Sequence, residues 1–122
     1  MVDVTIKLLV VSINWMNSNF YVLLEDGKIP EEKAKLSETN QPVNVAKDMS
    51  EELVTLSQYW MNYHLVETYM KDEDLNIVYK VVVPHDPNLS LNAGCEWKNI
   101  KLFNSEDQHL KESIEKAIRG IT

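Results

Sequence analysis

The 122 residues are the usual size of one domain, 1–122, and a composition of 44% hydrophobic and 25% charged residues excludes a disordered chain. The formal net charge of −7, with no run of Lys or Arg, argues against nucleic-acid binding, although a divalent cation can bridge an acidic protein to a phosphorylated small molecule. The lone Cys95 excludes an internal disulfide and favours a reducing, cytoplasmic compartment, and the longest apolar run, 8–11, is too short to cross a membrane.

The first half of the chain begins with two apolar segments. Residues 4–14 and 20–24 are rich in β-branched and apolar types, which predicts two strands, and the turn-forming residues 16–19 between them predict a hairpin. Residues 25–40 are polar and contain the pair Asp26-Gly27, so we predict a loop there.

A helix is predicted to follow this loop. Pro42 suits the first helical position, so the helix should begin after Asn40 or Gln41. Apolar residues at helical spacing give it one buried face: Val45, Met49, Leu53 and Leu56.

The second half predicts three more strands and a closing helix. The strands are Leu65 to Met70, Leu75 to Val83 and Cys95 to Leu102, and the closing helix has a capping pattern at Ser105 and Gln108 and a stop at Gly120. The order of elements predicts a mixed α/β or α+β sandwich, in which helices pack on a sheet.

The most unusual local feature is the acidic face of the first helix. Asp48, Glu51 and Glu52 stand at positions i, i+3 and i+4, so their carboxylates share one face, where each like-charge pair costs roughly 0.2–0.5 kcal/mol. Three such carboxylates suit a hard cation such as Mg²⁺, which could orient a diphosphate and activate a water molecule. The alternative is a solvated helix face, because acidic residues are also favourable near a helix N-terminus.

Residues 30–52 resemble the Nudix box, G-x5-E-x7-R-E-U-x-E-E-x-G-U, in which U is apolar. Residues 47–52, Lys-Asp-Met-Ser-Glu-Glu, look like R-E-U-x-E-E, and Ser37-Glu38-Thr39 looks like the segment that carries the first Glu. The opening hairpin, the pair Glu96-Trp97 in the late strand and the closing helix also resemble the family in order and type.

The resemblance implies a Nudix-type α/β/α sandwich with a mixed sheet and two main helices. It implies a protein that binds, and could hydrolyse with Mg²⁺, a nucleoside-diphosphate-linked compound of ADP-ribose or nucleotide type. Asp48, Glu51 and Glu52 would be the metal ligands, Glu51, Glu52 and Glu38 would be the catalytic residues, and Lys47 would be a structural partner. Within the family the chain is most similar to ADP-ribose-type enzymes and to the sensor domain of NrtR-type regulators.

Several departures from the box keep an alternative open. Glu31 and Glu32 replace the two family glycines, and eight residues rather than seven separate Glu38 from Lys47. Lys47 lacks the planar fork of Arg, and Asp48 has a shorter reach than Glu. The alternative is therefore a catalytically inactive Nudix-like sensor or protein-interaction module.

Several other residues can be considered for roles in catalysis, ligand binding or an interface. His85, in a loop beside Pro84, is the histidine that merits a test, and the three tryptophans, Trp15, Trp60 and Trp97, are expected to pack in the core. The aromatic segment 59–63 could form a homodimer surface, or it could equally be the lining after the predicted first helix.

Overall fold

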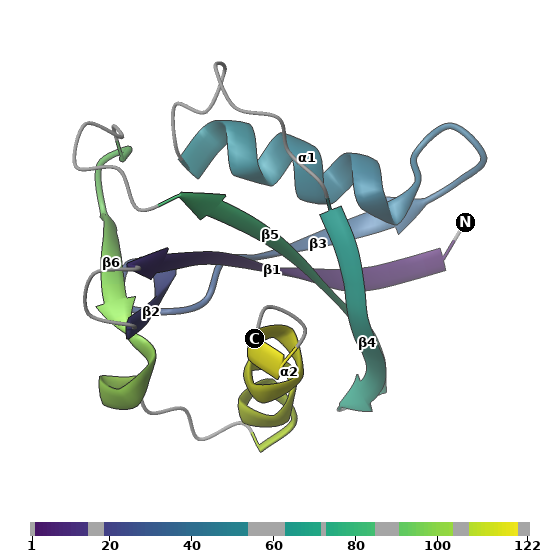
Figure 1. Cartoon of the computed structure of the whole chain (residues 1–122). Coiled ribbons are helices and arrows are strands. Elements are labelled where there is room, and N and C mark those ends of the chain that lie inside the picture. The colour runs from purple at the N-terminus through teal and green to yellow at the C-terminus, as the bar shows by residue number, and fades with distance from the viewer. Residues whose placement is uncertain are drawn as a thin grey trace.

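The computed structural model describes residues 2–14, 19–53, 63–71, 73–84, 91–103 and 108–119. In this part of the chain one mixed sheet of six strands lies between two helices (Figure 1). The elements, in chain order, are β1 (Val2–Asn14), β2 (Asn19–Glu25), β3 (Glu31–Leu36), α1 (Pro42–Leu53), β4 (Tyr63–Lys71), β5 (Asp74–Pro84), β6 (Cys95–Asn99), the 3-10 turn η1 (Ile100–Leu102) and α2 (Gln108–Arg119). No helix among the described residues is long and apolar enough to cross a membrane.

The long strand β1 organises the sheet. It runs parallel to β5 along one edge, from Val4 opposite Leu75 to Ile13 opposite Pro84. Along its other edge, its first half pairs antiparallel with β3 and its last four residues with β2. The sheet order is β4-β5-β1-β2-β6, with β3 beside β1. A strand with neighbours on both edges and helices on both faces is expected to be mainly apolar, as residues 8–11 of β1 are, although Thr5, Lys7 and Ser12 of the same strand are polar and buried.

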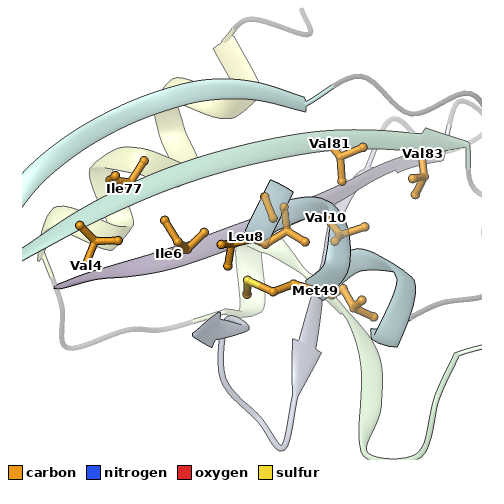
Figure 2. Packing of buried hydrophobic residues seen from close by; sticks show 11 residues of the cluster. Val4, Ile6, Leu8, Val10, Met49, Ile77, Val81 and Val83 are labelled. Atoms are coloured by element: carbon orange, nitrogen blue, oxygen red, sulfur yellow. The ribbon is translucent and has the colours of Figure 1, made fainter. Parts of the chain in front are cut away.

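Alternate residues of β1 enter two separate cores. The even-numbered residues from Val4 to Val10 contribute to the α1-side core, together with residues of β2, β5 and α1. Figure 2 shows these β1 side chains in line along the strand, with Met49 of α1 and the valines of β5 beside them. Leu9 and Val11 point to the opposite face and contribute to the α2-side core. This period of two is the basic geometry of a strand, and it places one helix on each face.

The predicted mixed α/β sandwich is confirmed, with two corrections. The segment 25–40 is not all loop, because Glu31–Leu36 forms β3. The strand predicted for residues 95–102 ends at Asn99, where η1 begins. Trp97 packs against the α1-side core, as predicted.

Some predictions fall outside the described residues. These concern Trp15, Leu56, the segment 59–62 with Trp60, His85, Ser105 and Gly120.

Candidate functional site

Helix α1 begins at Pro42, as predicted, and turns one side to the sheet. Val45, Ala46 and Met49 are buried on that side. Asp48, Glu51 and Glu52 are exposed, which agrees with the predicted acidic face.

The position of these carboxylates along α1 argues against the alternative that they are present because negative charge is favourable near a helix N-terminus. The first turn of α1 contains no acidic residue, and its last turn contains no basic residue. Glu51 and Glu52 lie at the C-terminal end, where the helix dipole disfavours negative charge. A favourable interaction with the N-terminal dipole therefore cannot explain the acidic cluster.

Glu52 lines a hollow of about 230 Å³ at the end of α1. The other lining residues come from the end of β2, the start of β3 and the buried face of α1: Glu25, Pro30, Glu31, Glu32 and Met49. Four carboxylates therefore surround the hollow, and none of these lining residues is basic. We call this feature the acidic hollow.

A tight turn brings the end of β2 and the start of β3 together. Glu25 and Lys28 exchange two backbone hydrogen bonds of 2.8 and 3.1 Å, and the central residues Asp26 and Gly27 have φ values of 52° and 81°. An Asp-Gly pair suits a turn in which both central residues have positive φ. The backbone N–H of Leu8 then donates to the carbonyl of Pro30 at 3.0 Å, which holds the start of β3 against β1.

The structure brings together only part of the predicted site. Glu52 lines the acidic hollow, whereas Asp48 and Glu51 stand within one turn of it on α1 but are not among the lining residues. Glu38 lies in the turn before α1, and about 15 Å of helix separates Pro42 from Glu52. Glu38 is thus near the opposite end of α1 from Glu52.

Sequence reasoning missed Glu25 as a site residue and treated Glu31 and Glu32 only as departures from a pattern. Both β3 residues are exposed and line the acidic hollow with Glu52. The signal that could have identified them was their position within residues 30–52, where the Nudix box that this segment resembles has glycines.

The next question is whether these side chains could coordinate a metal ion. Among the described residues, no three His, Cys, Asp or Glu side chains converge closely enough to form a metal site by themselves. Mg²⁺, however, commonly uses one or two carboxylates together with phosphate oxygens and water. The residues at the end of α1 fit an ion that arrives with a phosphorylated ligand, and they do not fit a cage made by the protein alone.

A hydrogen bond links this part of α1 to the edge strand β4. The buried Ser50 donates to the carbonyl oxygen of Lys47 at 2.7 Å, and its Oγ lies 2.5 Å from the hydroxyl of Tyr63. Burial raises the pKa of Tyr63; the hydrogen bond with Ser50 opposes this effect, and the charge of Glu51 adds to it. Tyr63 is therefore a neutral hydroxyl at physiological pH.

Cys95, at the start of β6, has none of the features of a nucleophile. Burial raises the pKa of its thiol, and the nearby charges of Glu25 and Asp26 raise it further. Because the thiolate is the reactive form, these effects suppress reactivity.

No protein-family model and no curated protein sequence matches this chain. Solved structures do match it. An Ap4A hydrolase from C. elegans superposes with a TM-score of 0.69 over 100% of both chains, at 10% identity. The C-terminal domain of mouse MUTYH, in a complex with human PCNA, gives 0.68 at 14% identity, over 98% of this chain and 90% of that one. The NUDIX domain of Shewanella oneidensis NrtR, complexed with ADP ribose, gives 0.61 at 12% identity, over 98% and 88%.

These matches cover nearly the whole chain at very low identity. Structural neighbours also include MutT/nudix proteins from Listeria innocua and Enterococcus faecalis. The chain therefore has the Nudix (MutT-like) fold, as the resemblance of residues 30–52 implied.

Proposed function

We propose that this Nudix-fold chain binds a nucleoside-diphosphate-linked compound, of ADP-ribose or nucleotide type, together with Mg²⁺. Among the structural neighbours, one is a hydrolase of Ap4A and another is complexed with ADP ribose. Because one fold supports many functions, the proposal depends on the chemistry of the acidic hollow.

The observation that carries the proposal is the set of four carboxylates around the hollow, contributed by Glu25, Glu31, Glu32 and Glu52. A free diphosphate would be repelled there, since like charges at short distance cost energy even in water. A divalent cation reverses the sign of this interaction and offers coordination positions to phosphate oxygens. Ligand binding should therefore require Mg²⁺, with Glu52 holding the ion and Asp48 and Glu51 supporting it from the same helix.

Hydrolysis is the second part of the proposal. The bound ion would neutralise the diphosphate and lower the pKa of a bound water. Glu51 and Glu52 are the candidate catalytic carboxylates, and Glu38 is an accessory candidate near the other end of α1. The distance of Glu38 and the replacement of Arg by Lys47 lead us to expect slow hydrolysis at most.

The alternative function is a catalytically inactive sensor or protein-interaction module. Its support is the pair Glu31 and Glu32, exposed on β3 at the positions of the family glycines. A second support is the MUTYH domain, a structural neighbour in complex with another protein. Under either function we propose a cytoplasmic protein that does not bind nucleic acid, and a homodimer through the segment 59–63 stays a prediction.

A thermal-shift screen tests the binding proposal. ADP-ribose, nucleoside triphosphates and dinucleotides are each added with and without Mg²⁺. A ligand at 100 times its Kd stabilises the native state by about 2.7 kcal/mol, so a specific ligand should raise the unfolding midpoint only when Mg²⁺ is present. If no ligand gives a Mg²⁺-dependent rise, the proposal is wrong.

Two variants test whether ligand binding and phosphate release depend on the acidic hollow. Glu52→Gln should weaken the Mg²⁺-dependent shift and abolish phosphate release, while Glu112→Gln, an exposed position on α2, should change neither. Ligand binding by the wild-type protein without phosphate release would favour the sensor. Phosphate release that survives in Glu52→Gln would refute the catalytic assignment.

A further inference from the structure

We infer that Tyr63 is a positioning residue, whose hydroxyl fixes the orientation of the acidic end of α1 for the Mg²⁺-dependent ligand. This inference rests on the proposed function. It assigns a role to a β4 residue that does not line the acidic hollow.

The direction of the hydrogen bonds follows from the chemistry of the two hydroxyl groups. Ser50 has one hydroxyl hydrogen, which it donates to the carbonyl oxygen of Lys47 at 2.7 Å. The hydroxyl of Tyr63, 2.5 Å from Ser50 Oγ, must therefore be the donor in the second bond. The result is a continuous chain of hydrogen bonds from the edge strand β4 to the backbone of α1.

This chain of hydrogen bonds supplies a constraint that apolar packing lacks. Val45, Ala46 and Met49 hold α1 against the sheet, but the hydrophobic effect has no directional preference. A hydrogen bond weakens steeply when its angle departs from linearity, so it restricts rotation of the helix about its axis. Because Glu51 and Glu52 directly follow Ser50, that rotation determines where their carboxylates project.

The acidic end of α1 also needs such a constraint. Asp48, Glu51 and Glu52 repel one another at helical spacing, and the last two oppose the helix dipole at the C-terminal end. Both effects favour fraying of the last turn in the ligand-free protein. The bond from Tyr63 counteracts fraying, because it ties the preceding turn to the sheet through Ser50.

Tyr63→Phe tests the inference, because it removes only the hydroxyl group. Tyr79→Phe is the matched control: Tyr79 lies on β5 and packs against the same α1-side core. Two quantities are measured for each protein: the Mg²⁺ concentration that half-saturates binding of ADP-ribose, or of the best ligand of the screen, and the amide exchange rates of residues 51–53 without ligand.

We expect Tyr63→Phe to raise the half-saturating Mg²⁺ concentration roughly 3- to 10-fold, the worth of one hydrogen bond, and to speed amide exchange in residues 51–53. Ser50→Ala should do the same, and the double variant should be no worse than either single one. Tyr79→Phe should leave both quantities unchanged. If Tyr63→Phe changes neither quantity, or only lowers global stability as much as Tyr79→Phe does, the inference is wrong.

The two proposals can fail separately. If the wild-type protein binds no ligand, the proposed function fails, and amide exchange alone decides whether Tyr63 orders the end of α1. If the wild-type protein binds ligand with Mg²⁺ but Tyr63→Phe matches it in both measurements, only the role of Tyr63 is refuted.

Discussion

Oε2 of Glu67, on β4, lies 2.6 Å from Nζ of Lys116, on α2. The other carboxylate oxygen of Glu67 accepts a hydrogen bond from the buried Ser113, one turn earlier on the same helix. The Glu67 side chain is 13% exposed, so this pair is less screened by water than an ordinary surface ion pair. It fixes α2 to the edge of the sheet on the face opposite α1.

This contact predicts a loss of stability in acid. Burial disfavours the charged form of Glu67, but the hydrogen bonds from Lys116 and Ser113 and the positive charges nearby outweigh burial and lower its pKa. A carboxyl with a lower pKa in the folded state stabilises the fold above its unfolded pKa and loses that contribution as pH falls through the folded value. The free energy of unfolding should therefore fall below about pH 4.5, the ordinary value for Glu.

Glu67→Gln provides the comparison, measured by urea unfolding between pH 3 and pH 7. At neutral pH the variant should be less stable by about 1.5–3 kcal/mol, the range for a hydrogen bond to a charged group. The difference from wild type should shrink as the pH falls through the lowered pKa that Glu67 has in the folded protein. A constant difference at every pH would show that ionisation of Glu67 contributes nothing.

The buried hydroxyl of Ser12 leads us to predict that removing it stabilises the fold. Its hydroxyl is fully buried in β1, and among the described residues it is the buried side-chain group without a hydrogen-bond partner. An unsatisfied buried polar group costs about 1–3 kcal/mol, so Ser12→Ala should raise the free energy of unfolding by about 1 kcal/mol. Ser50→Ala is the control, since Ser50 is equally buried but has two partners and should lose stability. A loss of stability in Ser12→Ala would mean that its hydroxyl is satisfied.

Two glycines with the same backbone conformation differ in their surroundings. Gly94 has φ +84°, and a Cβ there would lie 2.7 Å from Oδ1 of Asp26; Gly27 has φ +81°, and a Cβ there would meet no atom within 4 Å. Gly27→Ala should therefore cost only the backbone strain, about 1–2 kcal/mol. Gly94→Ala should cost more in thermal unfolding, because Asp26 must also move. Equal losses would show that the Asp26 side chain moves aside freely.

The elements that could be predicted from the sequence are those whose apolar residues recur at the spacing of a helix or a strand. Helix α1 and strand β1 could be predicted from the spacing of their apolar residues, because that spacing places those side chains in the cores that the two elements share with the sheet. Strand β3 was missed because Glu31–Leu36 has little apolar alternation and mostly exposed side chains. It is a strand because its backbone pairs with β1, from Val2 opposite Leu36 to Lys7 opposite Glu31. Such long-range pairing overrides local propensity and leaves no local signal.

The same limit applies to the candidate site. Glu52 was predicted from its spacing on one helix, which is a local property. Glu25 joins it only because the turn at residues 25–28 and the pairing of β3 with β1 bring three separate elements to one place. Glu38 lies before the opposite end of α1 from Glu52, so its role as an accessory catalytic residue stays a prediction.

The charge of the acidic hollow predicts opposite effects on two kinds of binding. The double substitution Glu31→Gln with Glu32→Gln halves the number of carboxylates that line the hollow. Each lost charge removes on the order of 1 kcal/mol of attraction for a cation at contact distance in water, so the Mg²⁺ concentration for half-maximal stabilisation by ADP-ribose should rise several-fold. Without Mg²⁺, the same variant should repel the diphosphate less and bind it better than the wild-type protein does.

A matched control separates the local field from the net charge of the chain. Glu112→Gln with Glu115→Gln removes the same number of charges from the exposed surface of α2, on the opposite face of the sheet. At 0.15 M salt the Debye length is about 8 Å, so these distant charges should hardly affect the hollow. If both double variants shift the Mg²⁺ titration equally, the effect comes from net charge, and the carboxylates of the hollow do not attract the ion. If only the β3 variant shifts it, Glu31 and Glu32 form part of the cation site.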